Sequence, residues 1–208
     1  MVKKKSSKEK TDTPVVNLFY QAIVIGASAG GFEVFTQILP QFDKHFSIPV
    51  IVVQHLHPDH TGSMATLLNE RAQITIKEAD EKEPLNPGHI YFAPANYHLL
   101  IEKDKTFSLS IDAKVNYSRP SIDVLFESAV NAFRSRLVGL LLSGANSDGA
   151  AGLRKIKNAG GITIVQNPET AYAAAMPGSA MALFNVDYVL NPDQIVSTIM
   201  RICERKTS

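Results

Sequence analysis

Three short stretches of the chain place residues capable of nucleophilic or acid–base chemistry directly after apolar runs. The hexapeptide GASAGG, which contains Ser28, follows the first run, His55 follows a second, and Asp148 lies in the turn after a third. A serine hydroxyl becomes an effective nucleophile when an imidazole accepts its proton and a carboxylate orients that imidazole. The residue types therefore indicate a Ser-His-Asp hydrolase, with Ser28, His55 and Asp148 as the candidate catalytic residues.

Each of these stretches also has another interpretation. GASAGG matches the G-x-S-x-G nucleophile elbow, but it also resembles an altered G-x-G-x-x-G phosphate loop, and Ser28 alone could cap the next helix. A dinucleotide site should have an acidic residue at the end of the second strand, where this chain has Gln54 and His55. Asp148 has a second interpretation as the cap of the helix that follows it.

The second stretch also matches a metal-site pattern. Residues 55–60 read HLHPDH, so His55, His57, Asp59 and His60 fit the H-x-H-x-D-H signature of zinc hydrolases. Such a site needs further ligands downstream, yet no histidine follows His98. A zinc hydrolase remains an alternative to the serine mechanism.

The elements that must position these residues alternate between apolar runs of strand length and longer amphipathic segments. This alternation predicts βαβ units and a three-layer, doubly wound, mostly parallel α/β sheet with helices on both faces. The expected strands are 20–26, 48–54, 137–143 and 161–166, and the expected helices are 30–39, 61–71, 120–134, 148–159, 170–183 and 192–205. Residues 73–112 contain four short apolar stretches, which we interpret as an antiparallel excursion with a hairpin near 89–112.

Composition limits the class of protein. The 208 residues have a formal net charge of +1, so nucleic acid and anionic membranes are not expected partners. The lone cysteine, Cys203, excludes an internal disulfide and suits a reducing cytoplasm. No apolar run is long enough for an export signal or a membrane span. We expect a basic flexible tail at 1–17 and one catalytic domain at 18–206.

Several separated motifs, in one order, resemble a known family. AIVIGASAGG, VVQH, NPGHIYFAPANYHLL, RPSIDVLFESA, LLSGANSDGAAG and AMPGSA are similar to the catalytic domain of the chemotaxis receptor protein-glutamate methylesterases, the CheB family. The resemblance extends from about Gln21 to the last helix. It implies cytoplasmic hydrolysis of γ-glutamyl methyl esters on chemoreceptor helices, and in some members deamidation of receptor glutamines, without a metal or cofactor.

By motif, the resemblance assigns Ser28 as nucleophile, His55 as general base and Asp148 as the residue that orients it. It also implies an oxyanion hole built from backbone N–H groups near His55 and Ala145. We expect the segments at 57–64, 117–123 and 172–180 to form a docking surface for the receptor helix. Within and beside it, the expected substrate contacts are Ala29, Arg119 and Met176.

This chain departs from the family pattern in two places. Residues 144–148 read GANSD where members commonly read GMGND, and Ala29 replaces a common threonine or serine. We also expect no receiver domain, so that phosphorylation control would require a separate phospho-receiver protein, and we expect a monomer. These departures leave a non-catalytic receptor-binding module of the same fold as an alternative to the esterase.

Overall fold

The computed structural model describes residues 20–55 and 63–203, and its centre is a seven-stranded sheet with the order β3-β4-β2-β1-β7-β8-β9. Every neighbouring pair in this sheet is parallel. Its strands are β1 Ala22–Ala27, β2 Val50–Gln54, β3 Thr75–Glu78, β4 His89–Phe92, β7 Leu137–Leu141, β8 Ile162–Gln166 and β9 Tyr188–Leu190. A separate antiparallel pair consists of β5 His98–Ile101 and β6 Phe107–Ser110. The predicted fold class is confirmed.

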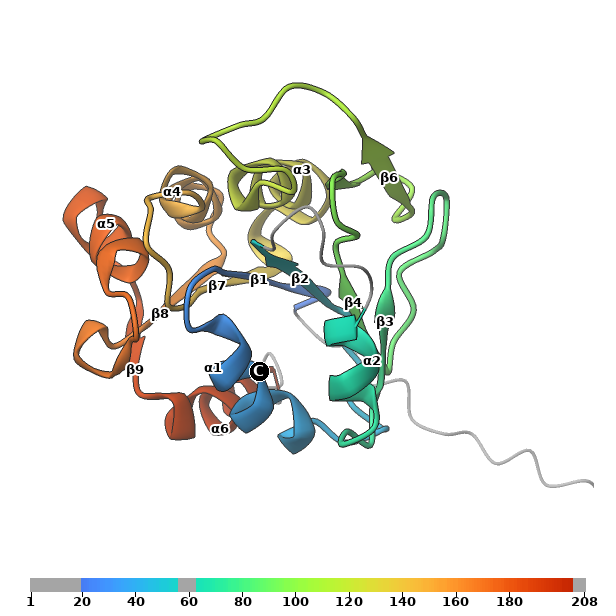
Figure 1. Ribbon diagram of the computed structural model, residues 1–208, viewed down its shortest axis with the longest axis horizontal. Helices are drawn as coiled ribbons and strands as arrows, with labels where there is room; N and C mark the ends of the chain where they lie inside the picture. The colour runs from blue at the N-terminus through green and yellow to red at the C-terminus, as the bar shows by residue number, and fades with distance from the viewer. Residues whose placement is uncertain (1–19, 56–62, 204–208) are drawn as a thin grey trace, which may run out of the picture.

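Helices cover both faces of the sheet (Figure 1). One face packs against α1 Gly31–Ile38, α2 Ser63–Asn69 and α6 Pro192–Cys203. The other packs against α3 Ile122–Phe133, α4 Ala150–Asn158 and α5 Ala175–Leu183, with β5 and β6 beside α3. Short 3-10 turns occupy Leu39–Gln41, Arg134–Arg136 and Pro168–Thr170. Because both faces are covered, β1, β2 and β7 are buried along their whole length, as their unbroken apolar runs predict.

The antiparallel interpretation of residues 73–112 is wrong for its first half. β3 and β4 are parallel members of the main sheet, with Ile76 paired to Ile90 and Ile51 paired to Tyr91. Only β5 and β6 form the expected hairpin. Short apolar stretches indicate a strand but contain no information about its direction, which is set here by the pairing of β4 with β2.

Helix ends follow local capping chemistry. α6 starts at Pro192 as predicted, and the Gln194 side chain accepts a hydrogen bond from the Asn191 N–H at 3.1 Å. The helix expected at 170–183 starts later, at Ala175, because a 3-10 turn capped by the Asn167 side chain precedes it. Strand β9 was not predicted, since its three residues are too short to show a pattern.

Candidate active site at the carboxyl edge of the sheet

Strand order places the three candidate catalytic residues at one point. After β1 the chain adds β2 beside it, forms β3 at the edge of the sheet and places β4 between β3 and β2, and it then returns to add β7 on the other side of β1. In open parallel sheets, ligands bind outside the carboxyl ends of the strands at such a reversal. Ser28 follows β1, His55 follows β2, and Asp148 lies in the loop after β7.

The imidazole of His55 is hydrogen-bonded to the carboxylate of Asp148. His55 Nε2 lies 2.8 Å from Asp148 Oδ2, and the two side chains are 10% and 0% exposed. The structure thus brings together two of the predicted residues that are 93 positions apart in the chain. Because Nε2 pairs with the carboxylate, Nδ1 is the ring nitrogen left to accept a proton.

Asp148 caps a helix, but not the one that follows it. Its carboxylate accepts hydrogen bonds from the backbone N–H groups of Ile122 at 2.7 Å and Asp123 at 3.2 Å, at the start of α3. The hydroxyl of Ser121 donates to it at 2.9 Å. The alternative in which Asp148 caps the helix after it is therefore wrong, because the N-cap residue of α4 is Gly149 and no side chain caps that helix.

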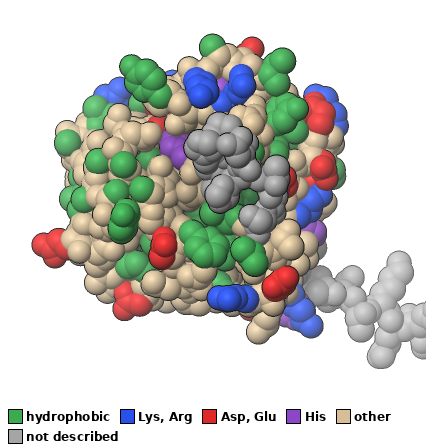
Figure 2. All heavy atoms as spheres, viewed as in Figure 1, with side chains coloured by type: hydrophobic (Ala, Val, Ile, Leu, Met, Phe, Trp, Pro, Cys, Tyr) green, Lys and Arg blue, Asp and Glu red, His purple; other side chains and the backbone are tan. Residues whose placement is uncertain are grey.

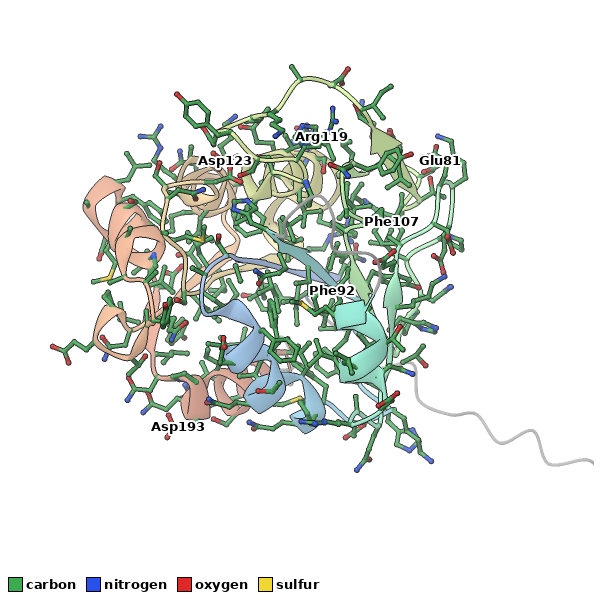
Figure 3. The ribbon with its side chains drawn as sticks, in the orientation of Figure 1. Glu81, Phe92, Phe107, Arg119, Asp123 and Asp193 are labelled. Atoms are coloured by element: carbon green, nitrogen blue, oxygen red, sulfur yellow. The ribbon has the colours of Figure 1, made fainter. Side chains whose placement is uncertain are left out.

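A second buried carboxylate lies beside the first. Asp123, in the first turn of α3, accepts a hydrogen bond from the Gly152 N–H of α4 at 2.6 Å. Asp148, in the loop before α4, therefore binds the start of α3, and Asp123, in α3, binds the first turn of α4. Asp123 is labelled on α3 in Figure 3. The Asn116 amide nitrogen joins the two carboxylates, with distances of 2.9 Å to Asp123 and 2.8 Å to Asp148.

Burial affects the pKa of the two carboxyl groups differently. Burial alone would raise the pKa of Asp148, but hydrogen bonds from His55, Asn116 and the Ile122 N–H outweigh it and lower that pKa below its usual value. The pKa of Asp123 is raised by burial and by the nearby charge of Asp148, with partial compensation from the Gly152 N–H. Asp148 is therefore held ionised beside the imidazole, as an orienting carboxylate must be.

A tight turn at residues 115–118 closes over this pair. Val115 and Ser118 exchange both backbone hydrogen bonds, and the two residues between them, Asn116 and Tyr117, have φ values of 51° and 63°. Two positive φ values in succession are typical of a type I′ turn. The Ser118 hydroxyl lies 3.5 Å from His55 Nδ1, so the turn reaches the imidazole as well as the carboxylates.

Ser28 lies on a sharp strand-to-helix turn beside His55. Its N–H donates to the Ser143 carbonyl at 2.9 Å, and the hydroxyl of Ser143 donates to the Ala29 carbonyl at 2.6 Å. Gly30 has a φ of 82°, and a Cβ there would lie 2.4 Å from Tyr172 Cβ, so the turn requires glycine. The β1–β2 register pairs Ala27 with Gln54, which places Ser28 next to His55. Within the described residues, no hydrogen bond joins the Ser28 hydroxyl to His55.

The backbone of His55 does not fit its predicted oxyanion role. The His55 N–H donates to the Ala27 carbonyl at 3.0 Å and extends the β1–β2 ladder, so it is not available to a developing oxyanion. In contrast, the N–H groups of Ala29 and Ala145 form no hydrogen bond within the described residues. Ala145 is also exposed, next to buried Gly144.

The predicted substrate contacts differ in accessibility. Ala29 is partly exposed in the turn after Ser28. Arg119 donates through Nη1 to the carbonyls of Ile111 at 2.7 Å and Asp112 at 3.0 Å, while its buried Nε has no partner in the described part of the chain. Figure 3 shows Arg119 on the same side of the sheet as α3. Met176 is fully buried and packs against Gly144, so in this structure it supports the loop before Asp148.

The zinc alternative has limited structural support. His57, Asp59 and His60 lie outside the described residues, as do most of the expected docking segment at 57–64 and the tail at 1–17. Among the residues that the structure does describe, no group of three His, Cys, Asp or Glu side chains could hold a metal ion. His55, the fourth proposed ligand, already directs Nε2 at Asp148.

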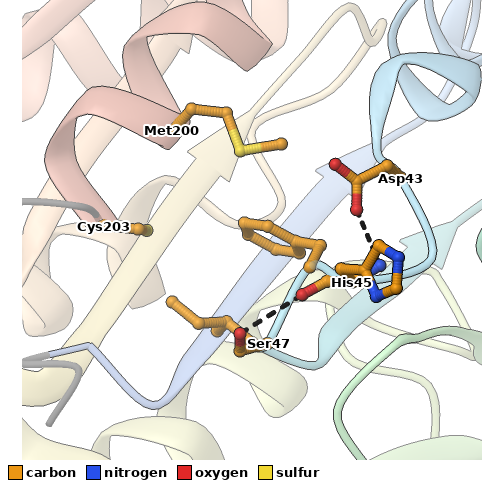
Figure 4. A pocket seen from close by; sticks show the side chains of 7 residues that line it. Asp43, His45, Ser47, Met200 and Cys203 are labelled. Carbon is orange, nitrogen blue, oxygen red and sulfur yellow. Dashed lines mark hydrogen bonds between the residues drawn. The ribbon is translucent and has the colours of Figure 1, made fainter. Parts of the chain in front are cut away.

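A different hollow lies at the amino end of β2. It has a volume of about 170 Å³ and is mostly apolar, with Phe46, Ile48, Met200 and Cys203 among its lining residues (Figure 4). Two side-chain hydrogen bonds of its lining are local, from the His45 N–H to Asp43 and from the Ser47 hydroxyl to the His45 carbonyl. The hollow lies before β2, whereas the candidate catalytic residues follow the strands, so it is not part of the same site.

The surface around the candidate site combines polar groups with the exposed rings of Tyr117 and Tyr172. In the view of Figure 2, acidic and basic side chains lie mainly around the rim of the visible face. A hollow of about 470 Å³ beside the tight turn is lined by Lys114, Asn116 and Tyr117. Among the described residues, no helix is long and apolar enough to cross a membrane.

Comparisons with known proteins identify relatives of this chain. A Leptospira interrogans protein, provisionally named protein-glutamate methylesterase/protein-glutamine glutaminase, is 52% identical over 183 residues, covering 88% of this chain and 95% of that protein. A Geobacter metallireducens protein of the same named activity is 36% identical over 89% of this chain and 54% of its own length. The chain thus spans about half of that longer relative.

The structural comparison points to the same family. The crystal structure of the Thermotoga maritima CheB methylesterase catalytic domain matches with a TM-score of 0.85 and 33% identity, covering 88% of this chain and 98% of that one. The family model for CheB methylesterase matches residues 23–199. The resemblance found in the sequence motifs is confirmed, and the chain belongs to the CheB methylesterase family.

Proposed function

We propose that this protein hydrolyses γ-glutamyl methyl esters on methylated chemoreceptor helices through Ser28, His55 and Asp148. The observation that supports the mechanism best is the 2.8 Å bond between His55 Nε2 and buried Asp148, with Ser28 on the adjoining strand end. The named activity of the relatives supports the substrate class. This mechanism uses protein groups alone, with no metal or organic cofactor.

The chemistry proceeds in two halves. In the first, the Ser28 hydroxyl attacks the ester carbonyl while His55 Nδ1 accepts its proton, and the imidazolium is stabilised by Asp148. Collapse of the tetrahedral intermediate breaks the bond to the methoxy group, which leaves as methanol with the proton from His55. In the second half, His55 activates a water molecule that cleaves the acyl-enzyme, and Ser28 regains its proton.

The oxyanion of the tetrahedral intermediate requires backbone donors. We assign these to the N–H groups of Ala29 and Ala145, which lack partners within the described residues and flank the turn after β1 and the loop after β7. In nucleophile elbows the residue after the serine commonly provides one such donor. Since backbone groups would bind the oxyanion, alanine at position 145 is compatible with activity.

Two exposed tyrosines flank the crevice and would contact a protein substrate. Tyr172, which is 85% exposed, packs its Cβ beside Gly30 in the nucleophile turn. Tyr117 is 97% exposed, between two residues that reach Asp148 and His55. Arg119, which is partly exposed, is a third candidate contact.

The same proposal covers location and partners. A receptor's cytoplasmic helix as substrate implies a cytoplasmic enzyme, and a separate phospho-receiver protein is a candidate regulator. Deamidation of receptor glutamines is a second candidate activity, because the relatives are also named protein-glutamine glutaminases. An acyl-enzyme formed from a glutamine would release ammonia in place of methanol.

The decisive experiment measures methanol release from a methylated receptor fragment and ammonia release from its glutamine form. Ser28→Ala should abolish both activities, whereas Ser197→Ala, at an exposed position of α6, should leave them unchanged. The same assay with a chelator tests the zinc alternative, which predicts a loss of activity when the metal is removed. Full activity in Ser28→Ala would overturn the serine mechanism, and receptor binding without hydrolysis by the wild type would favour the non-catalytic module.

A further inference from the structure

The side chain of Gln54, the last residue of β2, links the backbones of two proposed catalytic residues. Its Nε2 donates to the Ser28 carbonyl at 2.8 Å and to the His55 carbonyl at 3.0 Å. This orientation of the amide is required, because an oxygen facing two carbonyl oxygens would have no donor to bind. A single amide group therefore spans the two residues between which the proton must pass.

The two halves of the amide differ in how well they are satisfied. Gln54 is 6% exposed, and its Oε1 is buried without a partner among the described residues. An unsatisfied buried acceptor is costly. An apolar side chain of similar length would avoid that cost, but it would also remove the hydrogen bonds to the Ser28 and His55 carbonyls, so the gain from the amide lies in joining these two backbones.

Gly31 is fitted to this side chain. A Cβ at residue 31 would lie 2.2 Å from Gln54 Oε1 and 2.8 Å from Ala27 Cβ. The Gly31 N–H donates to the Ser28 carbonyl at 2.9 Å, so that carbonyl accepts hydrogen bonds from both residues. The final glycine of GASAGG thus makes room for Gln54, which explains a part of the motif that the nucleophile elbow leaves unexplained.

We propose that Gln54 is a positioning residue that fixes Ser28 relative to His55 for proton transfer. This inference rests on the proposed function. Misplacement of a reacting group by about 1 Å can reduce the rate by about 10²-fold. The amide acts on the reaction through the two backbones, since its own nitrogen is occupied by their carbonyl oxygens.

The test replaces the amide without changing the length of the side chain. Gln54→Met should lower kcat for a small methyl ester by about 10- to 100-fold with little change in KM. It should also slow labelling of Ser28 by a fluorophosphonate. Thr163→Val is the matched control, because Thr163 is fully buried in β8 and bonds Asp187, away from the site. This control should lower Tm and leave kcat and labelling unchanged.

A double-mutant cycle tests the pairing with Gly31. Gly31→Ala should reduce kcat by displacing Gln54, and its effect should be smaller in a Gln54→Ala background, where the close contact with Gln54 is removed and only that with Ala27 Cβ remains. Additive losses would contradict the pairing. If the wild type is labelled at Ser28 and Gln54→Met is labelled at the same rate and has the same kcat, this inference alone is overturned. If the wild type is not labelled at all, the proposed function is overturned and this inference with it.

Discussion

The two faces of the sheet bury different kinds of side chain. Against α1, α2 and α6 the core is built from aliphatic and aromatic residues such as Phe35, whose ring meets Phe92 edge-on at 5.5 Å. Against α3 and α4 the core contains the buried carboxylates of Asp123 and Asp148. Among the described residues, the α1 face buries no carboxylate.

The difference shows how a buried charge is accommodated. An ionised carboxylate away from water is strongly unfavourable unless donors surround it. Asp148 has five, and two of them are N–H groups at the start of α3, where the helix dipole also favours negative charge. The α1 face is stabilised by apolar packing, whereas part of the α3 face consists of hydrogen-bond donors that stabilise a buried charge.

The largest expected effect comes from removing that charge. Asp148→Asn should lower kcat by about 10⁴-fold, because a neutral amide can neither stabilise the imidazolium nor fix the His55 tautomer. Methanol release per folded molecule measures it. Asp193→Asn, at the exposed start of α6, is the control and should retain wild-type kcat. Equal losses in both variants would contradict a special role for the α3 face.

A large cavity on the opposite face should lower stability and leave kcat nearly unchanged. Phe35→Ala removes a fully buried ring from the α1 side and should cost about 3–5 kcal/mol of unfolding free energy. The site lies at the edge of the sheet, so kcat of the molecules that remain folded should be near wild type. Urea unfolding and active-site titration separate the two quantities. A loss of kcat comparable with that of Asp148→Asn would contradict the conclusion that the two faces of the sheet have different roles.

A smaller effect is expected from the amide that joins the two carboxylates. Asn116→Gly preserves a residue suited to positive φ but removes the donor to Asp148 and Asp123, and kcat should fall roughly tenfold. Tyr117→Gly alters the neighbouring position of the same turn and retains that amide. It should raise KM for the receptor fragment more than it lowers kcat for a small ester. Identical profiles for the two variants would show that only the turn matters.

The smallest effect concerns pH. The raised pKa of Asp123 means that the folded state holds its proton more tightly than the unfolded chain, so its contribution to stability is present below pH ~4 and is lost as pH rises through the folded pKa. Asp148 acts oppositely, and its contribution is lost as pH falls through its lowered pKa. Asp123→Asn should therefore reduce the loss of stability between pH 4 and pH 7, by about 1 kcal/mol. Urea midpoints across that range measure it, and an unchanged slope would contradict the assigned direction.

Features that repeat along the sequence could be predicted from it. The unbroken apolar runs identified β1, β2, β7 and β8, and the positions of Ser28, His55 and Asp148 after strands indicated one shared edge. Motifs that indicate the CheB methylesterase family, to which the chain belongs, lie at the same three positions. These signals are local, and the reversal of strand order then brings the residues together.

Contacts between distant segments could not be predicted in this way. Asn116 binds a carboxylate 32 positions away, and nothing in its neighbours indicates that partner. Gln54 resembles the polar end of any strand until the register places its amide beneath Ser28. The direction of β3 and β4 depends on a pairing that four-residue strands do not specify.

Because of the crossed hydrogen bonds of Asp148 and Asp123, the proposed catalytic site is intact only while α3 and α4 are docked together. Each carboxylate binds the first turn of the other's helix, so neither is in place unless α3 and α4 are together. The amide hydrogens of Ile122 and Gly152 should accordingly exchange with solvent in one cooperative opening event. Heating would then inactivate the protein when this helix pair separates, while the sheet beneath it is still intact.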